Sequence, residues 1–317
     1  MHGLDQFLFE EWLPQSSQPI DLIGSSIGAW RYANYCKPSF RQAFDDFERV
    51  YFGQTYKDNA TFKDISDEIY RILDAIFPDG CETDILNHPR YRINIFADAC
   101  RGLVKYDQPF ILGSSLLAAT LLNTVNRKTM QWFFKRYLFQ HQHSPQLIGN
   151  DRFQNTSVTF DADNLKSVIL ASGAIPLVVE GVTIPGHDKT CFRDGGLLDY
   201  HLTLNYNLES GIVLMPHFSP KLVTTWLDKY TPWRAPDTSG MENVLIITPS
   251  KEFIASLPYG KIPDRSDFKR FEGDDISRNQ YWRECTERSA ELASALAMVI
   301  ESGEIVDKLE PLEALHP

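Results

Sequence analysis

The chain reads Pro19-Ile20-Asp21-Leu22-Ile23 and then Gly24-Ser25-Ser26-Ile27-Gly28 near its start. The first five residues form a short apolar run, and the residues after the pentapeptide have helical character. A strand, a Gly-x-Ser-x-Gly turn and a helix in this order are typical of a nucleophile elbow. The turn is so sharp that a Cβ at either Gly24 or Gly28 is expected to clash. The pattern also predicts that Ser26 lies at a helix N-terminus, where backbone N–H groups favour negative charge on a bound oxygen.

A second motif, Asp194-Gly195-Gly196, lies well over a hundred residues further along the chain. Before it stands Leu170-Ala171-Ser172-Gly173-Ala174-Ile175-Pro176, which indicates a helix end closed by proline. An aspartate at the end of a short strand, followed by two glycines, can bring its carboxylate close to another backbone segment. Taken alone, Asp-Gly-Gly is also typical of a plain turn, so its meaning depends on the elbow upstream.

Together these blocks resemble the patatin-like phospholipase family. That family is similar in carrying Gly-x-Ser-x-Gly early in the chain, Asp-Gly-Gly/Ala much later, and an Ala-Ser-x-Ala-x-Pro stretch just before the aspartate. The resemblance covers residues 1–210, with its strongest blocks at 19–30, 170–176 and 193–199. It implies a three-layer α/β architecture and a catalytic Ser–Asp dyad, which here would be Ser26 and Asp194.

Hydrophobic periodicity predicts strands that alternate with helices along the chain. Strands are expected at residues 19–24, 90–97, 211–216 and 243–248. Helices are expected at residues 3–13, 26–36, 39–52, 63–77, within 111–139, at 163–174 and at 278–302. This alternation indicates an α/β fold with a mostly parallel central sheet and helices on both faces. We expect residues 1–210 to form a catalytic core, and residues 211–317 to add C-terminal strands and helices to the same domain.

The composition is that of an ordinary globular protein, with 317 residues of which 43% are hydrophobic and 23% are charged. The net charge of -11 argues against nucleic-acid binding and against broad electrostatic adhesion to anionic membranes. No apolar run approaches the ~20 residues of a transmembrane helix, and the N-terminus has no secretory-signal pattern. The five widely spaced cysteines predict reduced thiols. We therefore expect a cytoplasmic protein, with peripheral contact to a membrane as an option and an oligomeric state that the sequence does not specify.

A dyad would give the role of general base directly to the carboxylate. Asp194 is expected to accept the Ser26 hydroxyl proton as an acyl-enzyme forms, and then to activate water. Partial burial should raise the pKa of this carboxyl group, and Gly195 and Gly196 should allow its close approach. The resemblance implies hydrolysis of an acyl ester of a lipid, with no metal or organic cofactor. Acyl transfer to an acceptor other than water would share the first half-reaction.

The oxyanion hole is where the sequence departs from the family. In the resembled family a first strand and a glycine-rich loop precede a helix, which residues 3–13 match here, and the loop supplies the oxyanion donors. Loss of one such donor typically lowers the rate about 10²–10³-fold. The favoured interpretation is that the chain begins at an internal methionine of a longer product. Alternatively, another segment supplies donors, with the Ile27 N–H as a candidate, or the protein is a catalytically impaired relative that binds a lipid or a partner.

Histidines offer a rival site, because Ser26, Asp194 and then His201 or His217 follow the chain order of an α/β-hydrolase triad. Against this rival, too little chain precedes Ser26 for the several strands that come before an α/β-hydrolase elbow. A metal site at His141-x-His143 is a weaker hypothesis, because no acidic or cysteine ligand lies nearby in sequence.

The aromatic-rich segment 130–139 is expected to be a buried helix with an apolar stripe. The alternative is an interfacial element that contacts lipid, with Lys135 and Arg136 at the head groups.

Overall fold

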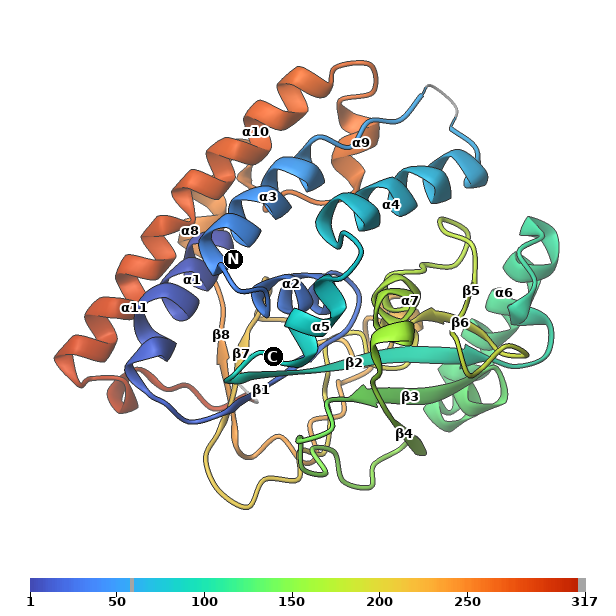
Figure 1. Ribbon diagram of the computed structural model, residues 1–317, viewed down its shortest axis with the longest axis horizontal. Coiled ribbons are helices and arrows are strands. Elements are labelled where there is room, and N and C mark those ends of the chain that lie inside the picture. The colour runs from blue at the N-terminus through green and yellow to red at the C-terminus, as the bar shows by residue number, and fades with distance from the viewer. Residues whose placement is uncertain (58–59, 313–317) are drawn as a thin grey trace. The chain divides into compact units, whose positions relative to one another are not determined.

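The structure is a computed structural model that describes residues 1–57 and 60–312. It has a mixed α/β architecture (Figure 1) and divides into two compact units. The site unit comprises Gln18–Ser210 and Val223–Glu242, and the terminal unit comprises Met1–Ser17, Gly211–Leu222 and Asn243–Pro317. Both sequence motifs lie in the site unit. The assignment of residues 1–210 and 211–317 to one domain stays a prediction.

A six-stranded sheet forms the centre of the site unit, and the long strand β2 (Tyr91–Cys100) pairs with three neighbours. The strand order is β4–β3–β2–β6–β5, and β1 also pairs with β2. The other strands are β1 (Ile20–Gly24), β3 (Phe134–Gln140), β4 (Asn155–Thr159), β5 (Val182–Thr183) and β6 (Cys191–Asp194). Almost every residue of β2 is buried, as expected for a central strand covered on both faces.

The sheet is mixed, so the prediction of a mostly parallel sheet is wrong. Strand β2 runs parallel to β1 but antiparallel to both β3 and β6. The β5–β6 pair is also antiparallel, whereas β3–β4 is parallel. One reason is that β3, which is antiparallel to β2, occupies part of a segment whose apolar residues also fit a helical period.

The segment 111–139 contains both helix and strand. Helix α6 (Pro109–Val125) is followed by the 3₁₀-helix η4 (Arg127–Trp132) and then by β3. Within β3, Phe134, Arg136 and Leu138 are buried in the alternating pattern of a strand. The prediction of a buried helix across 130–139 is therefore wrong. The alternative that places Arg136 at lipid head groups is wrong too, because its side chain is fully buried.

Helices α2, α5 and α7 of the site unit contact β2. The helices of this unit are α2 (Ile27–Tyr35), α3 (Phe40–Phe52), α4 (Phe62–Ile76), α5 (Cys81–Leu86), α6 and α7 (Ala162–Ser172), with 3₁₀ turns η3 (Gly102–Lys105), η5 (Gly195–Leu197) and η6 (Trp226–Tyr230). Capping boxes define where two helices begin: Thr61 pairs with Asp64 at α4, and Asp161 with Asn164 at α7. The predicted helices at 26–36, 39–52, 63–77 and 163–174 are confirmed to within three residues.

The terminal unit holds the parallel pair β7 (Val213–Pro216) and β8 (Val244–Ile247), as the sequence predicted for these segments. Its helical segments are α1 (His2–Gln6), η1 (Phe7–Trp12), η2 (Leu13–Gln15), α8 (Lys251–Ser256), η7 (Pro258–Gly260), α9 (Ser266–Arg270), α10 (Asp275–Arg288), α11 (Ala290–Ser302) and η8 (Val306–Lys308). The expected single helix at 278–302 is divided at Ser289, whose Oγ accepts a hydrogen bond from the Gly3 N–H. Within residues 1–57 and 60–312, no helix is long and apolar enough to cross a membrane.

Candidate active site

Ser26 lies in a strained turn between β1 and α2. Its backbone adopts φ 54° and ψ -132°, a conformation that is rare for any residue with a side chain. Ser26 is also the residue that immediately precedes helix α2, as a nucleophile elbow requires. A Cβ on Gly24 would lie 2.7 Å from the Ala29 nitrogen, so this turn can close only around a glycine. The predicted role of Gly24 agrees with this geometry.

Gly28 does not have the steric role that the sequence suggested. A Cβ built on Gly28 meets no atom within 4 Å beyond its chain neighbours and the backbone of α2 itself. Its N–H donates to the Ser25 carbonyl oxygen at 3.0 Å, which closes the first turn of α2. The prediction that a side chain would clash at both elbow glycines is therefore correct for Gly24 and wrong for Gly28. The difference arises because α2 leads the chain away from Gly28, whereas the turn folds the helix start back onto Gly24.

The two glycines after Asp194 act in different ways. A Cβ on Gly195 would lie 2.5 Å from the Phe96 carbonyl oxygen, so only glycine permits this close approach to β2. The Gly196 N–H donates to Asp194 Oδ1 at 2.7 Å and thereby fixes the carboxylate orientation. Asp194 itself is 6% exposed. Its second oxygen is directed toward the elbow.

The Ser26 Oγ donates a hydrogen bond to Asp194 Oδ2 at 2.7 Å. The register of the sheet explains how two residues so distant in sequence meet. Strand β1 ends at Gly24 opposite Ile95, and β6 ends at Asp194 opposite Ala97. Both strands occupy the edge of β2 that β3 leaves open, and they run toward each other. Their ends are therefore two residues apart along β2, which is about 7 Å.

The end of α7 and the residues that follow it hold both members of this pair. The Ser26 N–H donates to Ser172 Oγ at 2.9 Å, and the Asp194 N–H donates to the Ala174 carbonyl oxygen at 3.1 Å. Ser172 is fully buried at the end of α7. The Ala-Ser-Gly-Ala-Ile-Pro stretch that contains this serine predicts a helix end but no role for its side chain. The structure therefore adds Ser172 as a residue that positions the backbone of Ser26.

An amide donor is available beside the hydroxyl. Among residues 1–57 and 60–312, the Ile27 N–H has no hydrogen-bond acceptor. It is the first N–H of the nine-residue helix α2, so the helix dipole adds positive potential there. The neighbouring N–H groups of Ser26 and Gly28 are already bonded to Ser172 and Ser25. This geometry leaves Ile27 as a candidate oxyanion donor, as the sequence suggested.

The histidines of the site unit have other partners. Because Ser26 Oγ contacts Asp194 directly, no imidazole stands between them. The His201 Nδ1 accepts a hydrogen bond from the Val223 N–H at 2.9 Å, and its ring stacks on Tyr200. His141 Nε2 pairs with the Leu86 carbonyl oxygen, and its Nδ1 accepts from the His143 N–H. Within the described part of the chain, no group of three or more His, Cys, Asp or Glu residues is placed to hold a metal ion.

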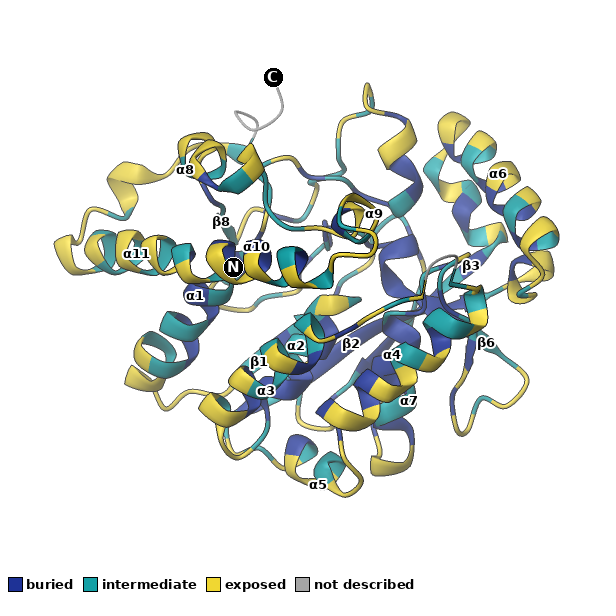
Figure 2. Ribbon diagram, turned by 90° about the horizontal axis from the view of Figure 1, so that it is seen from above, coloured by how far each residue is buried: buried dark blue, intermediate teal, exposed yellow. Residues whose placement is uncertain are grey.

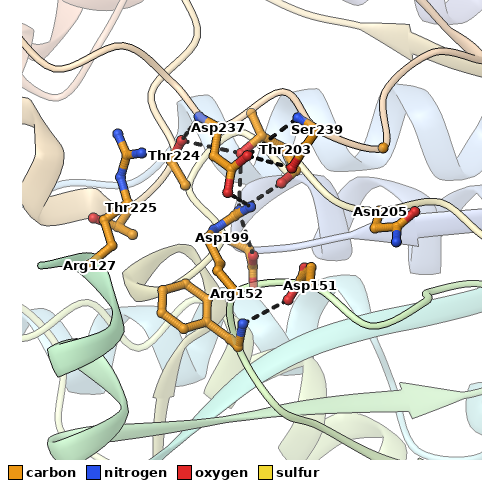
Figure 3. Close-up of polar contacts among 12 residues, drawn as sticks. Arg127, Asp151, Arg152, Asp199, Thr203, Asn205, Thr224, Thr225, Asp237 and Ser239 are labelled. Atoms are coloured by element: carbon orange, nitrogen blue, oxygen red, sulfur yellow. Dashed lines mark hydrogen bonds and ion pairs between the residues drawn. The ribbon is translucent and has the colours of Figure 1, made fainter.

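A buried cluster of charges holds the segment that follows Asp194. The Arg136 guanidinium forms a bidentate pair with Asp199 at 2.6 Å and also contacts Asp151 at 2.9 Å. Arg152 adds contacts to Asp237 at 3.2 Å and to Thr203 at 2.7 Å, as Figure 3 shows. These contacts join the loop before β4, the segment 199–203 and the loop around residue 237.

Burial and the neighbouring charges shift the pKa of several groups in this cluster. Burial raises the pKa of Asp199, although Arg136 and Arg152 oppose that shift. Burial alone would lower the pKa of Arg136, but Asp199 and Asp151 raise it above its usual value. Burial and the Asp199 carboxylate together raise the pKa of Asp98 well above its usual range. The cluster therefore depends on a charged Arg136 between two carboxylates.

We expect opposite effects when each elbow glycine is changed to alanine. Gly24→Ala should lower the free energy of unfolding by about 2 kcal/mol or more, because its Cβ meets backbone that cannot move independently. Gly28→Ala should leave it unchanged or raise it by up to about 1 kcal/mol, because alanine is the better helix former. Urea unfolding followed by circular dichroism measures both. Equal destabilisation by the two variants would contradict the described turn.

Arg136→Met should be strongly destabilising because it removes the cation paired with Asp151 and the bidentate partner of Asp199, which keeps only the more distant Arg152 at 3.7 Å. The expected loss is about 3–5 kcal/mol of unfolding free energy. Arg41→Met is the matched control, since Arg41 forms an exposed pair with Asp45 and should change stability by about 0.5 kcal/mol or less. An equal decrease of the urea midpoint in the two variants would show that the buried cluster contributes no more to the free energy of unfolding than an exposed ion pair.

Comparison with known proteins does not assign the chain to a family. No protein-family model matches it, and a search of the curated proteins finds no significant match. The functional interpretation therefore depends on the residues and their geometry.

Proposed function

We propose that the chain is a patatin-like serine acylhydrolase that cleaves carboxylic ester bonds of lipids through Ser26 and Asp194. The observation that carries the proposal is the 2.7 Å hydrogen bond from Ser26 Oγ to Asp194 Oδ2. Two features add to it. The serine lies in a strained strand-to-helix turn, and a separate N–H group holds the second carboxylate oxygen. A serine, a base and a group that orients the base are the parts that nucleophilic catalysis needs.

The first half-reaction would proceed at these atoms. Asp194 Oδ2 accepts the proton as Ser26 Oγ attacks the ester carbonyl carbon. The Ile27 N–H donates to the carbonyl oxygen as it becomes negative, aided by the N-terminus of α2. The protonated Asp194 then returns its proton to the departing alkoxide. The products of this half are an alcohol and an acyl-enzyme.

The second half-reaction would reuse the same base. A water molecule attacks the acyl carbon while Asp194 Oδ2 takes its proton. Collapse of the tetrahedral intermediate expels Ser26 Oγ, which recovers that proton, and a free carboxylic acid leaves. The Gly196 N–H keeps the carboxylate in place during both halves, because it bonds the oxygen that does not exchange protons.

A second candidate function is a catalytically impaired relative that binds a lipid or a protein partner. The observation that favours it is the donor supply at the elbow, where Ser26 N–H is already bonded to Ser172 and Gly28 N–H to Ser25. A site with the Ile27 N–H as its single donor would stabilise an oxyanion weakly, since each donor contributes about 10²–10³ in rate.

Labelling with a fluorophosphonate tests the nucleophile independently of turnover. We expect mass addition at Ser26 in the wild type, none in Ser26→Ala, and slower labelling in Asp194→Asn because the serine loses its base. Ser25→Ala is the matched control and should label at the wild-type rate. Absence of label at Ser26 in the wild type would exclude the dyad as a reactive unit.

Hydrolysis of para-nitrophenyl esters of graded acyl length distinguishes the two candidates. Ser26→Ala should lower kcat/KM by roughly 10³-fold or more, and Asp194→Asn by about 10³–10⁴-fold. A wild type that labels at Ser26 but does not turn over any ester would favour the impaired relative.

A further inference from the structure

Helix α6 exposes a row of large apolar side chains. Phe110, Leu117, Leu121 and Val125 are 87%, 60%, 60% and 82% exposed. At 100° per residue, these four positions fall within about a quarter of the helix circumference. Figure 2 shows the long exposed stretches of α6 on its outward side. Tyr106 before the helix and Trp132 after it are exposed as well. We call the four helix residues the α6 face, and Tyr106 and Trp132 its flanking aromatic residues.

The opposite side of α6 is fixed to the protein. Leu112, Leu116 and Ala119 are buried in a core cluster that also contains Leu197 and Leu198. No charged residue occurs within α6. A surface helix normally turns polar residues outward, and a helix that is apolar all round is normally buried. The α6 face is therefore apolar surface that would be stabilised by an apolar medium.

The charge around the α6 face differs from that of the rest of the chain. The protein carries 42 acidic residues, yet residues 108–150 contain none. Lys105 precedes α6 and Lys128 follows it, and both side chains are exposed. Asp107, the nearest acidic residue before this stretch, is paired with the Arg193 guanidinium. Asp228, which contacts Asn123 of α6, is buried and paired with Arg127 and Arg234. With these carboxylates paired and lysines on both sides of the helix, α6 can approach an anionic surface that would repel most of this protein.

We propose that the α6 face docks onto the surface of a lipid bilayer that contains anionic phospholipids. An apolar helix face inserts at the boundary between head groups and acyl chains, and lysines beside it contact the phosphates. Tyr106 and Trp132 have the amphipathic rings that favour this interfacial depth. The inference names a partner surface that would hold lipid esters, but the exposure and charge that carry it do not depend on catalysis at Ser26.

Vesicle co-sedimentation tests the apolar contact. The protein is the full chain with Ser26→Ala, and the vesicles are ether-linked phosphatidylcholine with a minor fraction of phosphatidylglycerol, so hydrolysis plays no part. We expect binding that falls about a hundredfold in Phe110→Ser/Leu121→Ser, because two apolar side chains no longer leave water. Ile276→Ser is the matched control, since Ile276 is 82% exposed on α10, and it should bind as the parent does.

Charge variants test the lipid class. Lys105→Gln/Lys128→Gln should lower binding to the anionic vesicles roughly thirtyfold, with little change on pure phosphatidylcholine. Lys251→Gln on the terminal unit is the control. Thermal unfolding should be the same for every variant, because each removes an exposed side chain.

Three results would overturn the proposal. The parent could remain in the supernatant with both kinds of vesicle, or the α6 variants could bind as tightly as the parent. Sedimentation equilibrium without lipid could instead reveal a dimer that Phe110→Ser/Leu121→Ser dissociates, which would make a second copy the occupant of this face. Failure of vesicle binding while Ser26 still labels with fluorophosphonate would reject the docking surface and leave the acylhydrolase proposal standing.

Discussion

The candidate site depends on two strands that share one edge of β2 and end head to head. Strand β1 covers the first half of that edge and stops at Gly24, while β6 covers the second half and stops at Asp194. Because β3 occupies the other edge from Asn94 to Cys100, the ends of β1 and β6 meet on the same edge of β2. A hydroxyl just beyond one strand end and a carboxylate at the other then meet at hydrogen-bond distance. If β6 ran parallel to β2, its last residue, Asp194, would lie at the end of β6 that is farther from Gly24, and the carboxylate would be directed away from Ser26.

Strain at the elbow requires neighbours that hold it. Ser26 has a positive φ, and such conformations persist only where surrounding contacts impose them. Ser172 and Ala174 bond the backbone N–H groups of Ser26 and Asp194 from a single segment, so one element sets both positions. The buried Arg136 cluster anchors the chain beyond Asp194. Buried ion pairs add little net stability, but they penalise any arrangement that separates the charges. Their contribution here is to geometry.

Short motifs in the sequence predicted the residues of this site. The strands and buried contacts that hold these residues join segments far apart in the sequence, and they were not predicted. The elbow, Asp194 and Gly195 each have a short motif with a steric reason, and the structure places them together. Strand β3 was not predicted, because Phe133-Phe134 and the residues around them fit a helical period as well as a strand. The antiparallel direction of β6 was not predicted either, because alternating strands and helices favour a parallel sheet. The burial of Arg136 was missed because its partner Asp199 is 63 residues away. Gly28 shows the reverse error, in which a motif residue was given a steric role that its surroundings do not require.

The core that anchors α6 also supports the turn after Asp194. Leu197 and Leu198 follow the two glycines of that turn and share one apolar cluster with Leu112 and Leu116 of α6. The outward side of α6 is therefore connected to the candidate base through close-packed side chains, and close-packed interiors transmit small displacements. Under the proposed docking, contact of the α6 face with lipid would bear on the apolar cluster that holds Leu197 and Leu198, the residues that follow the Asp194 turn. A bilayer bound at the α6 face would in this way affect the geometry of the Ser26–Asp194 pair without any change in the two residues themselves.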